Sequence, residues 1–308
     1  MRIALLCATR RGFRVLEQLI RQQPEAELIV FSFREEAHEP PFLDDIQQLA
    51  EAHGAAFYEA RQVGAPKWAD FWANTPIDLM LTVSWRYLIP REVYERVRLG
   101  TYVLHDSLLP AYRGFAPTVW AIINGEDHTG VTLFEIAEGV DSGRIIAQQR
   151  VPIGPDDTIA DVMEAVTQSY LAVLAAQLPA LLDGTAGRTE QDESRATYTC
   201  KRIPEDNRID WTQPTAVIYN LIRAVSAPYP GAFTTLNGHR LYIWAAQRVA
   251  VPPYVGRVIG RVIEIRRGEG VVVLTSDGAL LIQRVSWEGE PPVAAEQILN
   301  NLSHTLGR

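Results

Sequence analysis

The 308-residue chain contains only two cysteines, Cys7 and Cys200. Two thiols cannot build a disulfide framework or a four-ligand zinc site, so both are predicted to be buried thiols in a reducing compartment. No run reaches the roughly 18 uninterrupted apolar residues that a membrane span requires. The chain opens directly on a strand-like run, residues 2–7, without the pattern of a secretory leader. We therefore expect a cytoplasmic protein with no membrane partner.

Motifs that bind nucleotides or metals are also missing. The segment after the first apolar run is ATRRGF, which has a single glycine, so neither GxGxxG nor GxxxxGKS/T is present to cradle phosphates. No HExxH pair or His/Cys cluster indicates a metal, and no GxSxG elbow marks a serine nucleophile. These absences predict a site without metal and without the usual dinucleotide cradle.

Positive charge is scarce for a protein that would bind nucleic acid. The chain has 29 Lys and Arg against 37 Asp and Glu, a formal net charge of −8. Residues 34–45 (REEAHEPPFLDD) hold one arginine and five acidic side chains, and residues 205–308 hold ten basic and nine acidic ones. Since phosphate backbones bind basic surfaces, nucleic acid is not expected as the partner.

The first half of the sequence alternates buried strands with amphipathic helices. Continuous apolar strands separated in this way are typical of a parallel sheet covered by helices on both faces. The predicted fold class is therefore α/β, with a Rossmann-like, mostly parallel sheet. Strands are expected at 2–7, 28–33, 77–83, 101–104, 130–135 and 145–151, and helices after the first strand and at 42–53 and 158–183.

The pattern changes after Gly184. A polar stretch is followed by one helix, 214–225, and then by short strands with Asn237–Gly238 and Asp277–Gly278 as turn signals. Several short strands in so few residues predict a small β-rich, OB-like domain. The expected division is a catalytic domain over 1–184, a linker over 185–204 and a C-terminal domain over 205–308.

Two side chains suit proton transfer. His105 follows a predicted strand, and open α/β sheets bind ligands at the carboxyl ends of their strands. Asp141 lies in a glycine-bracketed loop, EGVDSG, from which a carboxylate can orient an imidazole. Taken singly, such a histidine more often bonds backbone and such an aspartate more often forms an Asx turn. Arg10 and Arg11, directly after the first strand, can meet a phosphate or simply be solvated.

The stretch HDSLLPAYRG…AP…NGE…TGVTLFEIAEGVDSGRI, within residues 105–145, closely resembles the signature of folate-dependent formyltransferases. That family includes methionyl-tRNA formyltransferase and the sugar-nucleotide N-formyltransferases, and the resemblance is closest to those that formylate UDP-4-amino-4-deoxy-L-arabinose. WRYLI at 85–89 resembles the segment that lines the folate pocket. Residues 210–233 resemble the start of the family's C-terminal domain.

The resemblance implies transfer of a formyl group from 10-formyltetrahydrofolate to a primary amine through a tetrahedral intermediate. The family uses an Asn-x-His pair and a later aspartate; His105 and Asp141 match the last two, whereas Val103 stands where the asparagine is expected. Three alternatives stay open: protonated His105 is the sole side-chain donor to the oxyanion with help from a backbone N–H, Asp106 has reorganised the site, or formyl transfer has been lost.

The resemblance also assigns the two ligands. Folate is expected at Trp85, Arg86, Tyr87, Leu88, Ile89, Glu138, Gly139, Val140 and Asp141. The acceptor is expected at Arg10, Arg11, Ser107, Leu108, Leu109, Pro110, Arg113 and Gly114. A nucleotide-linked amino sugar is the favoured small-molecule acceptor. Methionyl-tRNA, an amino acid of siderophore or secondary metabolism, and a non-catalytic relative that binds folate or a sugar nucleotide are the alternatives. The oligomeric state, a homodimer included, stays open.

Overall fold

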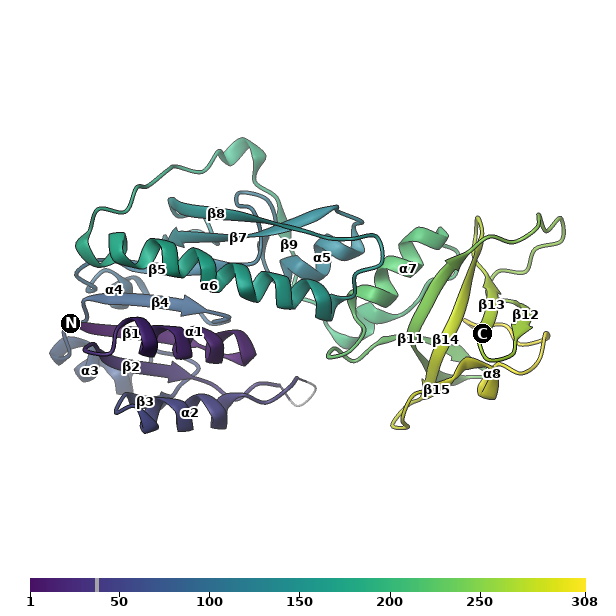
Figure 1. The fold of residues 1–308 in the computed structure, drawn as a ribbon, viewed down its shortest axis with the longest axis horizontal. Coiled ribbons are helices and arrows are strands. Elements are labelled where there is room, and N and C mark those ends of the chain that lie inside the picture. Colours follow the sequence, from purple (N-terminus) through teal and green to yellow (C-terminus); the bar gives the residue numbers. More distant parts are fainter. Residues whose placement is uncertain (37–38) are drawn as a thin grey trace. The chain divides into compact units, whose positions relative to one another are not determined.

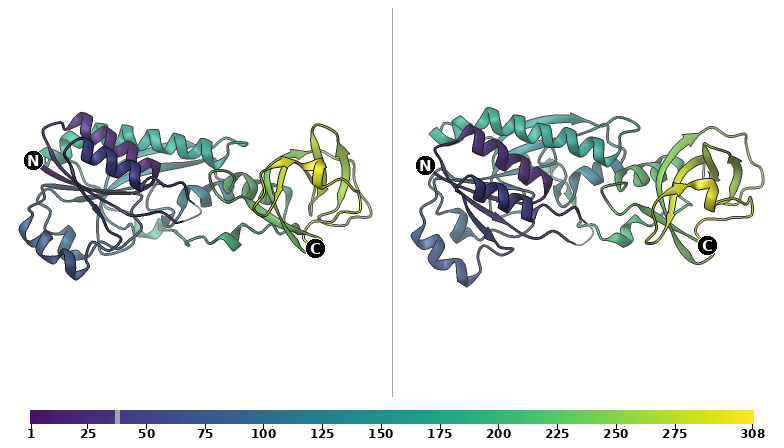
Figure 2. Two further views of the ribbon diagram at one scale, coloured as in Figure 1. Left: turned by 90° about the horizontal axis from the view of Figure 1, so that it is seen from below. Right: turned by 60° about the horizontal axis from the view of Figure 1, so that its bottom comes forward.

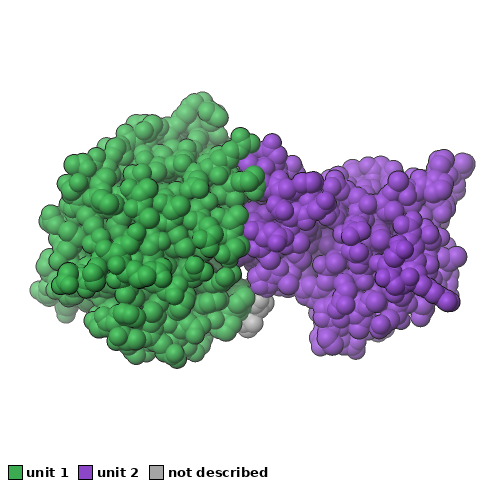
Figure 3. Space-filling view, in the orientation of Figure 1, with its two compact units in different colours: residues 1–117, 129–152, 164–200 green, residues 118–128, 153–163, 201–308 purple. Residues whose placement is uncertain are grey.

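The computed structural model describes residues 1–36 and 39–308, so residues 37 and 38 of the acidic stretch 34–45 lie outside it. By contacts, the chain divides into two compact units (Figure 3). Unit 1 comprises residues 1–117, 129–152 and 164–200, and unit 2 comprises residues 118–128, 153–163 and 201–308. Residues 185–200, expected to be part of a linker, therefore pack within unit 1.

A seven-stranded sheet forms the centre of unit 1, in the order β3-β2-β1-β4-β5-β7-β8 (Figure 1). The first five strands along this order pair in parallel and β7 is antiparallel to β5, which confirms the predicted, mostly parallel sheet. The strands are β1 (Arg2–Cys7), β2 (Glu27–Ser32), β3 (Ala56–Glu59), β4 (Leu79–Val83), β5 (Thr101–His105), β7 (His128–Glu135) and β8 (Ile145–Pro152).

Helices cover both faces of this sheet. Figure 2 shows α1 (Thr9–Gln22), α2 (Leu43–Ala52) and α6 (Ile159–Asp183) along one face and α3 (Ala69–Asn74) on the other. By length and composition alone α6 could cross a membrane, since it has 25 residues and a mean hydropathy of 1.4 over its most apolar window. Its Val166, Tyr170 and Leu174 are buried at four-residue spacing, which is the pattern of a helix packed on a sheet.

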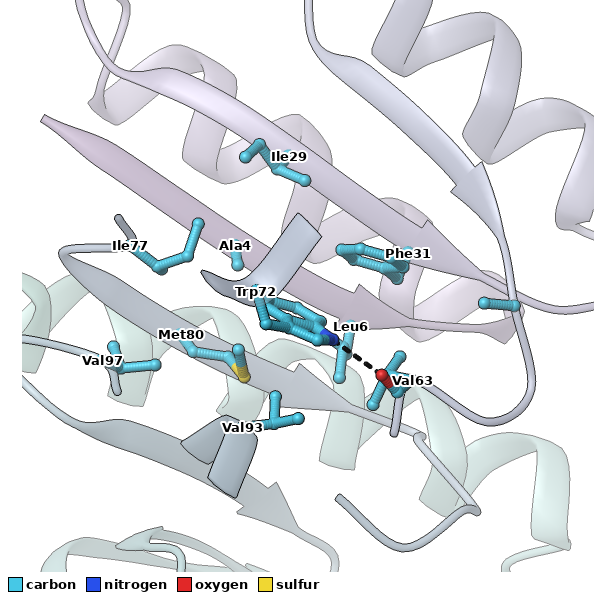
Figure 4. Close-up of a cluster of buried hydrophobic side chains, with 11 residues drawn as sticks. Ala4, Leu6, Ile29, Phe31, Val63, Trp72, Ile77, Met80, Val93 and Val97 are labelled. Carbon is cyan, nitrogen blue, oxygen red and sulfur yellow. Dashed lines mark hydrogen bonds between the residues drawn. The ribbon is translucent and has the colours of Figure 1, made fainter. Parts of the chain in front are cut away.

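The opposite face carries a core of alternating strand residues (Figure 4). Leu6 of β1 and Phe31 of β2 point towards Trp72 of α3, and the rings of Phe31 and Trp72 stack with centroids 5.3 Å apart. The Nε1 atom of Trp72 donates a hydrogen bond of 2.7 Å to the Val63 carbonyl. Burial on both faces explains why the strands read as continuous apolar runs.

Unit 2 contains an antiparallel sheet in the order β10-β11-β14-β13-β12, with β15 paired to β14. Asn237 and Gly238 connect β10 to β11, and both have positive φ, as a tight hairpin turn requires. The expected β-rich C-terminal domain is confirmed. Its elements are α7 (Thr215–Ala224), β10 (Ala232–Leu236), β11 (His239–Val249), β12 (Val262–Arg266), β13 (Gly270–Leu274), β14 (Ala279–Trp287), β15 (Val293–Ala294) and α8 (Ala295–Ile298).

Several short elements complete the fold, and one prediction about cysteine is wrong. Cys7 is buried on β1, but Cys200 is exposed, because it follows a two-residue strand at the surface. The short elements are α4 (Arg91–Tyr94), α5 (Pro117–Ile123), β6 (Arg113–Gly114), β9 (Tyr198–Thr199), η1 (Pro66–Trp68), η2 (Glu193–Arg195) and η3 (Pro204–Asn207).

Replacing Trp72 by phenylalanine tests the buried hydrogen bond. The Val63 carbonyl then loses its donor, so the free energy of unfolding should fall by about 1–3 kcal/mol in urea denaturation. Trp72→Ala should cost about 3–5 kcal/mol because it also leaves a cavity. Val255→Ala is the control, since Val255 is fully exposed. Wild-type stability of Trp72→Phe would contradict a stabilising role for this bond.

Candidate functional site

The carboxyl ends of β1, β4 and β5 lie at one edge of the sheet of unit 1. Cys7 pairs with Val83, and Val83 with Leu104, so the chain leaves these three strands at the same level. Thr9 and Ser84, just beyond β1 and β4, have φ values of 65° and 55°. Left-handed backbone in such residues is strained, and strain of this kind gathers at functional sites.

His105 is the last residue of β5 and is nearly buried. Its Nε2 lies 2.9 Å from the Tyr112 carbonyl, which can only accept, so Nε2 carries the proton in a neutral ring. The lone pair is then on Nδ1, which lies 3.7 Å from Oδ2 of Asp141. That carboxylate oxygen also accepts a hydrogen bond of 2.7 Å from the Gly114 N–H. The structure thus brings His105 and Asp141 together.

Asp141 itself has left-handed backbone, with φ of 47°, and so do Tyr112 and Ala116, with φ of 59° and 51°. Conformations of this type cost on the order of 1–3 kcal/mol each and persist only where the surroundings enforce them. Tyr112 lies on the connection from β5 to β6, Ala116 lies between β6 and α5, and Asp141 lies on the loop between β7 and β8.

The loop after His105 is tied to the strands behind it. Ser107 Oγ donates to the Ala111 carbonyl at 2.7 Å, and Thr132 Oγ1 donates to the Ser107 carbonyl at 2.6 Å. The Leu109 N–H donates to the same Thr132 hydroxyl at 3.1 Å, just before the cis bond to Pro110. Leu108 fills the space beside Gly130, where a Cβ would come within 2.3 Å of it. These contacts shape the loop; its role in binding the acceptor stays a prediction.

Both predicted phosphate-binding arginines are paired with carboxylates. Arg11 Nη1 lies 2.6 Å from each carboxylate oxygen of Asp106, and the Arg11 guanidinium lies 4.8 Å from the centre of the Tyr170 ring. The Tyr170 hydroxyl contacts the Asp106 carboxylate and lies 2.9 Å from the Leu104 carbonyl. Arg10 forms an exposed ion pair of 2.9 Å with Glu164. The phosphate contact stays a prediction for both.

The Arg11–Asp106 ion pair determines the protonation of the carboxyl group next to His105. Burial by itself would raise the pKa of Asp106, but Arg11, the Tyr170 hydroxyl and His105 together hold that pKa below its ordinary value. Burial and the Asp106 charge raise the pKa of Tyr170 well above its ordinary value. Asp106 is thus a carboxylate whose charge Arg11 matches, while Asp141 faces the imidazole.

Val103 lies two residues before His105 on β5, so both side chains point to the same face of the sheet. It is half-buried and lies between Thr82 of β4 and Phe134 of β7 in the strand register. A valine offers only methyl groups there.

The predicted folate segments combine packed and exposed side chains. Trp85 and Ile89 pack against the core of Figure 4, and Trp85 and Tyr87 both meet the edge of the Phe33 ring. The buried Nε1 of Trp85 has no hydrogen-bond partner among the described residues. Leu88 is 90% exposed.

The remaining folate candidates are at the surface. Arg86 forms a bidentate ion pair with Glu39, both bonds at 2.6 Å. Glu138, Gly139 and Val140 are exposed, and Val140, at 57%, presents an apolar side chain from the Asp141 loop.

The structure also shows residues that the sequence analysis missed. They are Gln191 and Glu193, which bond the side chain of Arg113. Arg113 is 1% exposed, and its contact with the substrate stays a prediction. Gln191 in turn contacts the Asp141 loop. Neither contact has a local sequence signal, because about eighty residues separate Arg113 from its partners.

Two further observations concern metal binding and cavities. Among residues 1–36 and 39–308, no group of three or more His, Cys, Asp or Glu side chains could hold a metal ion. A cavity of about 490 Å³ lies in unit 2, lined by Tyr219, Arg223, Trp244 and Arg248 among others, and no predicted site residue contributes to it.

Two family models match the chain. The model described as formyl transferase matches residues 3–178, and the model described as formyl transferase, C-terminal domain, matches residues 202–303.

Solved structures share the fold at low sequence identity. An N-formyltransferase from Helicobacter canadensis, in complex with folinic acid and dTDP-3-aminofucose, is 17% identical with a TM-score of 0.68, over 91% of this chain and 97% of that one. HypX from Aquifex aeolicus, in complex with tetrahydrofolic acid, is 22% identical with a TM-score of 0.63, over 96% of this chain and 46% of HypX. A methionyl-tRNA formyltransferase from Clostridium thermocellum is 19% identical with a TM-score of 0.55, over 80% and 93%.

Removing one partner of the Arg11–Asp106 pair should destabilise unit 1. Arg11→Leu leaves a buried carboxylate without its counter-charge, so we expect a loss of about 3–5 kcal/mol in urea denaturation at neutral pH. Because the folded pKa of Asp106 lies below its unfolded value of about 3.9, the pair stabilises above that value and its contribution disappears as the pH falls through the folded pKa.

The double variant Arg11→Leu, Asp106→Leu is the matched control. It removes both charges and should regain a large part of the lost stability. Its stability should also fall less steeply in acid than that of the wild type. A single variant as stable as the wild type would contradict the role given to this pair.

Proposed function

The chain belongs to the formyl transferase family, and on that premise we propose that it moves the formyl group of 10-formyltetrahydrofolate to the primary amine of a small acceptor, a nucleotide-linked amino sugar. The observation that carries this proposal is the imidazole of His105 between two fixed groups, the Tyr112 carbonyl and the Asp141 carboxylate. An attacking amine must lose a proton, and an imidazole held in this way is suited to take it.

Each group of the pair has a role in that step. His105 accepts the amine proton on Nδ1, because Nε2 already donates to Tyr112. Asp141, at 3.7 Å, stabilises the imidazolium that results. The tetrahedral intermediate then collapses with cleavage of the bond between the formyl carbon and N10, and the imidazolium returns the proton to N10 of the departing tetrahydrofolate. The Gly114 N–H keeps the Asp141 carboxylate in place at 2.7 Å.

The missing asparagine bears on the oxyanion of the tetrahedral intermediate. Of the three alternatives, we favour His105 as the side-chain donor, because Nδ1 can donate a hydrogen bond to the oxyanion once it has taken the amine proton. A reorganisation through Asp106 has less support, since its carboxylate is occupied by Arg11 and Tyr170. Loss of activity remains the competing hypothesis that Val103 supports.

The exposed apolar side chains of Leu88 and Val140 support the proposed folate site, because a planar ring system can cover such surfaces. The buried, unpartnered Nε1 of Trp85 offers a donor there. The folate supplies the formyl carbon. Structures of similar fold that contain folinic acid or tetrahydrofolic acid support the same assignment. A chain with two cysteines, one buried and one exposed, suits the reducing cytoplasm as the compartment.

A sugar nucleotide is favoured over tRNA by charge. The balance of ten basic and nine acidic side chains over residues 205–308 offers little attraction to a phosphate backbone. The similar fold of the Helicobacter canadensis enzyme, which binds dTDP-3-aminofucose, adds support.

A panel of amines tests the proposal. With 10-formyltetrahydrofolate and amino-sugar nucleotides, mass spectrometry should show the addition of one formyl group, and His105→Ala should lower kcat by about 10²–10⁴-fold. Methionyl-tRNA and free amino acids complete the panel. Val255→Ala is the control, since it lies in unit 2 and is fully exposed. Absence of formyl transfer to every amine would refute the proposal.

Val103→Asn separates the hypotheses about the oxyanion. If His105 is the only side-chain donor, an added amide on the same face should raise kcat, by up to about 10²-fold. Val103→Leu adds no donor and should bring no gain. A fall in kcat for Val103→Asn would instead indicate a site built around valine. A gain from no activity to measurable activity would support the degenerate relative.

A further inference from the structure

Residues 185–200, here called the strap, leave the end of α6 and run past β8 towards β9 (Figure 1). Thr189 and Ile145 exchange two backbone hydrogen bonds of 2.8 Å at the start of β8. Further on, the strap forms β9, which pairs in parallel with β6 at Arg113 and Gly114. The strap therefore contacts the segment that follows His105.

Between these two attachments, Gln191 bridges the Asp141 loop and Arg113. Its Nε2 donates to the carbonyls of Asp141 and Gly143 at 2.8 and 2.7 Å. Its Oε1 accepts from Arg113 Nη2 and Nε at 2.7 and 3.2 Å. Both amide hydrogens and the amide oxygen are used, and the reverse orientation would set two carbonyls against an oxygen.

Arg113 makes this bridge rigid. Its side chain is almost completely buried and is bonded by both carboxylate oxygens of Glu193, at 2.6 and 2.9 Å, and by the Tyr198 hydroxyl at 3.1 Å. Glu193 and Tyr198 both belong to the strap. Gln191 is thus held by a guanidinium that the strap itself fixes.

The loop that Gln191 contacts, residues 136–143, has a strained and closely packed backbone. Asp141 has left-handed backbone, and a Cβ on Gly143 would lie 1.6 Å from the Glu135 carbonyl. The carboxylate of Asp141 bonds the N–H of Gly114, which lies on the strand paired with the strap. Both the main chain and the side chain of Asp141 are therefore positioned through the strap.

We propose that Gln191 is a positioning residue for catalysis, which sets the Asp141 carboxylate relative to His105 through its two hydrogen bonds to the Asp141 loop. The inference rests on the proposed function, because that function gives Asp141 its role. A displacement of about 1 Å in a reacting group can cost on the order of 10²-fold in rate. Loss of these bonds should therefore lower kcat more than it changes substrate binding.

Gln191→Glu is the informative variant. It keeps the size of the side chain and the acceptor for Arg113, but it replaces the two donors with an oxygen that repels the Asp141 and Gly143 carbonyls. We expect kcat to fall by about 10–100-fold, with KM for folate and acceptor within about threefold of the wild type. Gln191→Ala should show the same split, and Glu190→Gln, a change at the exposed neighbour, should leave both constants unchanged.

Hydrogen exchange of residues 136–143, measured without substrates, gives a second readout that does not depend on activity. Gln191→Glu should speed exchange in this loop and leave strand β13 unchanged. Wild-type exchange in the loop, or a wild-type kcat, would overturn the inference. A wild-type enzyme that formylates no amine would refute the proposed function instead, and the exchange data would still decide whether Gln191 holds the loop.

Discussion

The buried ion pair between Arg11 and Asp106 is the interaction on which the arrangement of the site depends. Asp106 directly follows His105, so the contacts that fix its carboxylate also fix the end of β5. Arg11 comes from α1 and Tyr170 from α6, the helices that cover one face of the sheet. Arg11 matches the charge of Asp106, and Asp141 is the carboxylate that lies 3.7 Å from Nδ1 of the imidazole.

Asp141 is held from the other direction, by the strap. The two supports differ in physical character: the first is an ion pair between packed layers, and the second is a set of hydrogen bonds to main-chain carbonyls. The pair that we propose to be catalytic needs both supports, since the 3.7 Å separation of Nδ1 and Oδ2 depends on the end of β5 and on the loop that carries Asp141. Strained backbone at Tyr112 and Asp141 is tolerated because these supports enforce it.

Much of the fold and the central pair could be predicted from the sequence. Apolar runs predict strands that are buried on both faces, and hence a parallel sheet. The position of His105 at the end of a predicted strand places it at the carboxyl edge of that sheet. The pairing of Arg11 with Asp106 could not be predicted, because 95 residues separate them and each also suits a solvated position. The strap was predicted to be part of a linker since its composition is polar. Its structure comes from side-chain hydrogen bonds and from short backbone pairings, and neither leaves an apolar periodicity in the sequence. Cys200, the last residue of the strap, is exposed because this end of the strap lies at the surface.

The net charge of the chain disfavours an acceptor with many phosphates, but it is compatible with an acceptor that has one or two. Attraction to a nucleic acid grows with each phosphate that a protein neutralises, so a surface with nearly equal basic and acidic side chains gains little from a polyanion. A nucleotide sugar brings only two phosphates, and one or two well-placed donors can bind them despite a net charge of −8. At the reacting end, the carboxylate of Asp141 disfavours a further anion. Electrostatics therefore supports the proposed acceptor, a small amine with few phosphates, over a nucleic acid.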